Sequence, residues 1–296
     1  MSASDSLPDA DSPQSGPGLP AEEYVEQAHL FRTLGERMRQ HMAVQELLIS
    51  IKEEILSTTR LPMAMDFLAA ELKLRGAFST AMAKMPHYFT AFQTYVVAEA
   101  EADRGKFDLA VALKILEREA AYRASGTATP QGVFIFQFEC LCRNRLGYDK
   151  GLEAVALDPL FDDDWRQWIL TVRRQVGIID FADLIYVRSE RYIRDRLRQG
   201  LPPENEGKPA LFGDREGRIA WANRRKEPLL LFAALHRQLG YPAVPRQEPI
   251  DQTPEIIPAL LRRVERLETR LRLVEEEQTH GAIDLTKFYG PPKENE

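Results

Sequence analysis

Two short motifs bring together side chains that could bind a metal. Glu26-x-x-His29 puts a carboxylate and an imidazole on one helix face, which is half of the ligand set of a helical di-iron site. Cys140-x-Cys142 offers two thiols for zinc, but they fall on different helix faces within an apolar stretch. The chain has no third cysteine. We therefore expect no metal and no cofactor, with a capping or surface role for the first motif and buried thiols in the second.

Two further sites combine residues of the acid and base types. Asp162-Asp163-Asp164 offers the carboxylate oxygens that magnesium prefers, but these residues directly precede a helical stretch. We expect Asp162 to cap this helix and its acidic neighbours to complement the helix dipole. His87-Tyr88 has no carboxylate partner at a recognisable spacing, which favours packing in a turn over acid–base catalysis.

The motifs of the common enzyme classes are absent from the sequence. It contains no P-loop, no glycine-rich dinucleotide turn, no G-x-S-x-G elbow and no H-E-x-x-H helix. The sequence thus predicts no catalytic residues and favours an interaction protein over an enzyme. An unfamiliar active site is an alternative, because catalytic residues can come from distant parts of a chain.

The segment 188–226 is the best candidate for binding an anion. Arg188, Arg191, Arg194 and Arg198 are expected within about 120° of arc on one helix. Arginine can clamp a phosphate or carboxylate and tryptophan can stack on a base, so nucleic acid or an anionic ligand is an alternative partner. The structural alternative is that these arginines pair with the acidic N-terminal region. The candidate residues are Arg188, Arg191, Arg194, Arg198, Arg218, Trp221, Arg224, Arg225 and Lys226.

Charge is unevenly distributed along the 296 residues, whose formal net charge is −6. Residues 1–165 contain 16 Lys and Arg against 25 Asp and Glu, a net charge of −9. Residues 166–226 contain 14 against 8, a net charge of +6. This basic block can attract an acidic partner, although a dedicated nucleic-acid domain usually has a pI above ~9.

A heptad repeat predicts a short coiled coil near the C-terminus. Arg263 and Arg270 fall at g positions, and Glu268 and Glu275 fall at e positions, so a parallel pair would join opposite charges. We expect self-association through this helix. Packing on its own chain or on another protein is the alternative, since so short a helix is marginal alone. The apolar a and d positions are Ile257, Leu260, Val264, Leu267, Leu271 and Val274.

The elements that must position these residues are mainly helical. Pro62 and Pro228 mark expected helix starts, and Gly240 marks an expected helix end. Residues 210–221 predict a small β-hairpin, because turn residues alternate there with short apolar runs. The predicted regions are a disordered tail (1–20), a helical domain (21–241) with an irregular basic segment (200–227), a proline-rich linker (242–254), the coiled-coil helix (255–278) and a flexible tail (279–296).

The helical domain is expected to be mainly α, either an irregular bundle or a set of α-solenoid-like hairpins. Residues 147–154 (Gly-Tyr-Asp-Lys-Gly-Leu-Glu-Ala), with Leu157-Asp158-Pro159 after them, resemble the second helix of tetratricopeptide-type hairpins. This resemblance extends over residues 61–160, but the fixed period of that family is missing. The whole chain is also similar to a family of bacterial proteins without a known function, and that resemblance implies no activity.

We expect a cytoplasmic scaffold or adaptor that binds a protein partner or a second copy of itself. The first twenty residues contain no Lys, no Arg and no apolar core, which argues against a secretory signal. The longest run of apolar residues, 229–235, is far shorter than the ~18 residues needed to span a bilayer. No membrane association is therefore expected.

Overall fold

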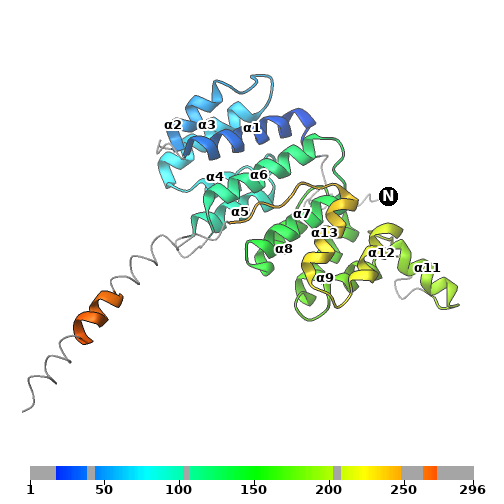
Figure 1. Cartoon of the computed structure of the whole chain (residues 1–296). Coiled ribbons are helices and arrows are strands. Elements are labelled where there is room, and N and C mark those ends of the chain that lie inside the picture. Colours follow the sequence, from blue (N-terminus) through cyan, green and yellow to red (C-terminus); the bar gives the residue numbers. More distant parts are fainter. Residues whose placement is uncertain (1–17, 39–43, 103–106, 203–207, 248–262, 272–296) are drawn as a thin grey trace, which may run out of the picture. The chain divides into compact units, whose positions relative to one another are not determined.

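A computed structural model describes the chain over five stretches, and it is mainly helical, as expected. The chain separates into two compact units, residues 1–247 and 248–296. The described stretches are 18–38, 44–102, 107–202, 208–247 and 263–271. The described helices of the first unit (Figure 1) are α1 (Ala21–Arg37), α2 (Val44–Lys52), α3 (Leu61–Arg75), α4 (Phe78–Ala83), α5 (Ala91–Glu101), α6 (Leu109–Ala124), α7 (Pro130–Arg143), α8 (Tyr148–Ala156), α9 (Asp163–Gln175), α10 (Phe181–Val187), α11 (Glu190–Arg198), α12 (Asp214–Asn223) and α13 (Pro228–Leu239).

The helices of the first unit pack as an irregular bundle. Helix α1 has its most extensive contacts with α6, and its Leu30, Phe31 and Leu34 are buried there. Helix α5 also contacts α8, and α7 contacts α13. In a solenoid each repeat touches only its neighbours in sequence. These contacts between distant helices therefore identify a bundle and not a stack of hairpins.

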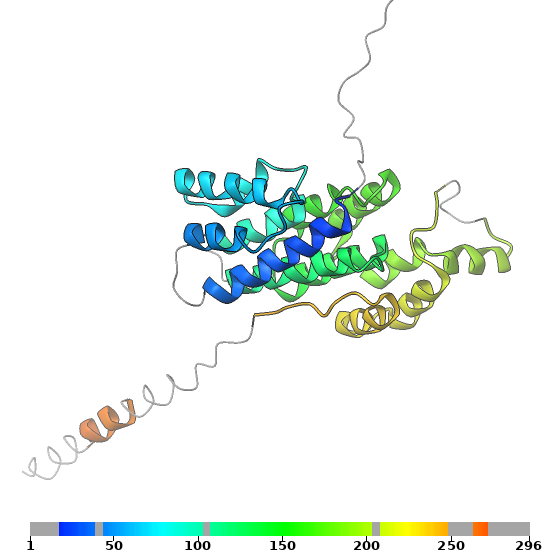
Figure 2. The same ribbon diagram turned by 90° about the horizontal axis from the view of Figure 1, so that it is seen from above.

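Helix α7 forms the centre of the hydrophobic core. Residues 133–136 are all fully buried, so this helix is buried on every side and not along one stripe. It contacts α6, α8 and α13. Trp165 and Trp168 of α9 pack on Phe134, with ring centroids 5.8 and 4.9 Å away. Figure 2 shows the green helices between the blue and cyan N-terminal helices and the yellow helices α12 and α13.

Several predicted helix boundaries are confirmed. Pro62 lies in the first turn of α3, and Pro228 lies in that of α13. Asp162 accepts a hydrogen bond of 2.9 Å from the backbone N–H of Trp165 and so caps α9. Gly240 ends α13 with a φ of +66°, a conformation that glycine adopts without steric strain.

The β-hairpin predicted near residues 210–221 is wrong. Residues Asp214–Asn223 form α12, and the strand-like pairings of the described residues are isolated bridges such as Ser189 with Phe212. Gly217 lies inside α12, where an added Cβ would come within 2.3 Å of Ser189 Oγ. This glycine therefore permits two helices to approach closely and does not form a turn.

After α13 the chain follows the bundle surface as an extended strap, residues 241–247. Tyr241 is buried and donates a hydrogen bond of 2.7 Å to Glu139. Arg118 of α6 donates to the carbonyl of Ala243. The side-chain amide of Asn144 donates to the carbonyl of Pro245 at 3.0 Å. The strap is thus attached to α6 and to the end of α7.

Candidate functional site

The heptad segment is described over residues 263–271, where the backbone is helical. Val264, Leu267 and Leu271 are 48%, 53% and 61% exposed. Spacings of three and four residues place them along one stripe of the helix. The flanking residues Arg263, Glu268 and Arg270 are also exposed. The other predicted residues of this surface, Ile257, Leu260, Val274 and Glu275, lie outside the described residues.

Within the basic segment, Asp214 gathers several arginines. Its carboxylate lies 2.8 Å from Arg194 Nη1 and 2.5 Å from Arg218 Nη2. Arg191 lies 4.0 Å from the same carboxylate and 2.8 Å from that of Asp195. Desolvation raises the pKa of Asp214, but the Arg218 hydrogen bond and the charges of Arg194 and Arg191 outweigh it, so the pKa lies below its usual value. These arginines are therefore partly neutralised by local carboxylates.

The next cations of the segment also have partners on the protein. Arg224 forms an ion pair with Asp183, and its guanidinium lies 4.3 Å from the ring centroid of Trp221. Arg188 donates a hydrogen bond of 3.2 Å to the carbonyl of Pro209. Trp221 is 53% exposed. Its indole ring and the guanidinium of Arg224 therefore form this part of the surface together.

Two expectations about the basic segment are wrong. Arg188 does not share a helix with the later arginines, because it follows α10 while Ser189 caps α11. The carboxylates that form the ion pairs come from the segment itself (positions 195 and 214) or from α10 just before it (position 183), and not from the acidic N-terminal region. Arg198 and Lys226 are exposed, and none of the residues that the structure describes pairs with their side chains.

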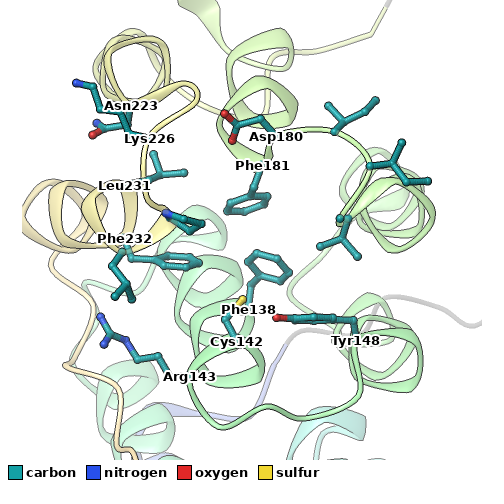
Figure 3. A pocket seen from close by; sticks show the side chains of 16 residues that line it. Phe138, Cys142, Arg143, Tyr148, Asp180, Phe181, Asn223, Lys226, Leu231 and Phe232 are labelled. Carbon is teal, nitrogen blue, oxygen red and sulfur yellow. The ribbon is translucent and has the colours of Figure 1, made fainter.

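An apolar pocket, here called the aromatic pocket, opens between α7, α8, α13 and the loop before α10. Its volume is about 450 Å³. The rings of Phe138, Phe181 and Phe232 pack against one another in its wall (Figure 3), with centroids 4.3 to 6.1 Å apart. Val176 and Leu231 add aliphatic surface. The sequence offered no local signal for this pocket, since its lining comes from separate elements.

Cys142 and Tyr148 form the polar part of the pocket wall. The phenol points toward the thiol (Figure 3), and the two groups share a hydrogen bond. Burial raises the pKa of Cys142 to about 11 and that of Tyr148 to about 12. Both groups are therefore neutral near pH 7, and Cys142 does not act as a thiolate nucleophile. Cys140 is buried, as expected, whereas Cys142 reaches the pocket.

Three charged residues line the mouth of the aromatic pocket: Arg143, Asp180 and Lys226. Arg143 forms an ion pair with Glu139. Both carboxylate oxygens of Asp180 accept hydrogen bonds from backbone N–H groups, at 3.0 and 2.5 Å. The ammonium of Lys226 has no described partner. The mouth thus holds two cations and one carboxylate.

The other candidates from the sequence do not converge on a site. Glu26 accepts a hydrogen bond of 3.4 Å from the backbone N–H of Leu56, and His29 lies 3.7 Å from Glu54. His87 is exposed in its turn. Over the described stretches, no group of three His, Cys, Asp or Glu side chains could hold a metal ion.

A buried charge cluster joins residues for which the sequence gave no signal. Arg123 of α6 forms ion pairs with Asp158 and, at 2.8 Å, with Glu119. Gln137 of α7 donates a hydrogen bond of 2.7 Å to Glu119. Burial raises the pKa of Glu119, and the charge of Arg123 only partly opposes this. The cluster connects α6, α7 and the turn after α8 inside the core.

Comparisons of this chain with protein-family models, with curated proteins and with solved structures give no match. Among the helices in the described part of the chain, none is both long and apolar enough to cross a membrane. Within the described residues, the heptad stripe exposes apolar side chains and the aromatic pocket opens between helices of the first unit.

Proposed function

We propose that this protein is a non-enzymatic helical adaptor that self-associates in parallel through its heptad segment. The exposed stripe of Val264, Leu267 and Leu271 carries this proposal. Full burial of one such side chain is worth roughly 1.5–3 kcal/mol, so a partner helix that covers the stripe would be stabilised by it. The helical unit would then be the part that each copy presents to another protein.

The flanking charges favour a second copy of the same helix as the partner. In a parallel pair, the g residue Arg263 faces the e residue Glu268 of the other copy, which is an attractive pair. An antiparallel pair would instead oppose g with g and e with e, which places like charges together. The pattern therefore supports parallel self-association. Because the repeat spans only about two and a half heptads, the association should be weak and concentration-dependent.

A pair of matched charge insertions tests this proposal in the full chain. Leu267→Glu puts a charge into the stripe, whereas Thr269→Glu puts the same charge at the outer f position of the same helix. In sedimentation equilibrium, we expect wild type and Thr269→Glu to associate and Leu267→Glu to remain a monomer. Wild type that stays monomeric at all concentrations, or equal masses for both variants, would contradict self-association.

Charge reversal tests the parallel arrangement. Glu268→Arg should weaken association, because it would face Arg263 of the other copy. The double variant Arg263→Glu with Glu268→Arg should restore it, since the pair is attractive again. If the double variant is weaker than either single variant, the helices are not parallel.

Binding of nucleic acid through the basic segment is the alternative function, and it has less support. Arg191, Arg194, Arg218 and Arg224 already pair with carboxylates of the protein. A phosphate backbone would have to compete with these pairs. Affinity for RNA or DNA at low salt, where phosphate contacts are strongest, would favour this alternative.

A further inference from the structure

We propose that the aromatic pocket binds a small amphipathic carboxylate, with the apolar body in the pocket and the anionic head at Lys226. This inference does not depend on the heptad segment, because every lining residue belongs to the first unit. A medium-chain fatty acid has the required chemistry.

The size and lining of the pocket suit a small apolar body. Its volume of about 450 Å³ falls in the range of roughly 300–1,000 Å³ that is typical of small-molecule sites. Phe138, Phe181 and Phe232 face into it (Figure 3). Ile178 and Leu229 at the rim are 82% and 45% exposed. A ligand that covers this apolar surface gains about 25 cal/mol for each Å² removed from water.

The inner wall of the pocket does not suit a charged group. Cys142 and Tyr148 are its polar residues there, and both are neutral near pH 7 because burial raises the pKa of each. They already share a hydrogen bond. An ionised group placed against this wall would lose its hydration without gaining an opposite charge. The charged end of a ligand must therefore lie at the mouth.

The mouth favours a negative head over a positive one. Lys226 is the cation without a described partner, while Arg143 is shared with Glu139. The carboxylate of Asp180 accepts hydrogen bonds from the backbone N–H groups of Ala182 and Arg225. An ammonium head would meet two cations, Arg143 and Lys226, and one carboxylate, that of Asp180, so the lining charges favour a negative head over a positive one. A carboxylate head would form an ion pair with Lys226.

Displacement of anilinonaphthalenesulfonate, a fluorescent probe with an aromatic body and a sulfonate, tests the proposal on the full chain. We expect the probe to bind the folded protein and decanoate to displace it. Decylamine has the same chain with the opposite charge, and it should bind roughly tenfold more weakly, which corresponds to about 1.4 kcal/mol. Equal displacement by decanoate and decylamine would overturn the assignment of an anionic head.

Two neighbouring leucines on α13 provide a matched pair of variants. Leu229 and Leu230 are 45% and 52% exposed, but only Leu229 is among the residues that line the pocket. Leu229→Trp should fill the mouth and reduce decanoate affinity by roughly tenfold or more. Leu230→Trp should leave it unchanged. Equal affinity of the two variants, at unchanged melting temperature, would show that decanoate binds elsewhere and would overturn the proposal.

The role of Lys226 is tested by removing its charge. Lys226→Gln should weaken decanoate binding and leave the neutral ligand decanol unaffected, because only the carboxylate interacts with the ammonium. Lys114→Gln, at an exposed lysine of α6 outside the pocket, is the control for net charge. Absence of any decanoate binding to wild type, or equal losses for the two lysine variants, would overturn the proposal.

Discussion

At the scale of single residues, the buried charge cluster gives the fold a pH dependence of known sign. Burial raises the pKa of Glu119 even though Arg123 lies beside it. A carboxyl whose pKa is higher in the folded state stabilises the fold fully below its unfolded pKa, which is about 4.3. That contribution is lost as the pH rises through the folded pKa.

We therefore expect the stability of wild type relative to Glu119→Gln to decrease as the pH rises above about 4.3, the pKa of the unfolded state. The amide does not titrate, so the difference isolates this carboxyl. Each unit of pKa difference corresponds to about 1.4 kcal/mol. Urea unfolding at several pH values measures the effect, with Glu53→Gln as an exposed control. A difference that is the same at every pH would contradict the raised pKa.

Cys142 gives a second prediction at this scale. Because burial raises the pKa of Cys142 to about 11, little thiolate is present at pH 7. Its alkylation by iodoacetamide should be about a hundredfold slower than that of a free cysteine, and should accelerate as the pH rises. Mass spectrometry of the modified protein measures the rate. Rapid alkylation at pH 7 would show that the thiol is more exposed than the structure has it.

At the scale of elements, two helical glycines should respond to alanine in opposite ways. A Cβ at Gly217 of α12 would lie 2.5 Å from Arg191 Cβ, so Gly217→Ala should destabilise the protein by about 1–3 kcal/mol. At Gly35 of α1 the nearest contact would be 3.6 Å, to Leu113. Gly35→Ala should stabilise by about 0.5–1 kcal/mol, because alanine favours the helix. Thermal unfolding compares the two variants, and an equal effect would contradict this packing.

The ends of helices could be predicted from the sequence, because local chemistry determines them. Pro62 and Asp162 act through their own backbone neighbours, and both mark the expected helix starts. The hairpin predicted over residues 210–221 includes Gly217, because a glycine required for contact between two helices has no local signature. The net charge of a block of residues likewise does not indicate which of its charges pair with one another. The carboxylate of Asp214 pairs with arginines of the same basic block. The aromatic pocket could not be predicted from the sequence either, because its lining residues come from separate helices that only the tertiary fold brings together.

At the scale of the whole molecule, the first unit should fold without the second. Residues 1–247 form one compact unit, and the buried residues of the core lie within it. A chain that ends at Gln247 should keep the melting temperature of the full protein, measured by circular dichroism at a concentration where both are monomers. A melting temperature lower by several degrees would show that residues 248–296 contribute to the stability of the first unit.

The strap 241–247 also determines how a mechanical load enters the folded unit. A force that pulls the chain beyond residue 247 first meets the hydrogen bond between Asn144 and Pro245. The contacts of Ala243 with Arg118 and of Tyr241 with Glu139 follow in series. Such bonds open one at a time, so the strap would peel away at low force. The load would reach α13 only after buried Tyr241 has left the core. The strap would therefore detach before the helices of the bundle unfold.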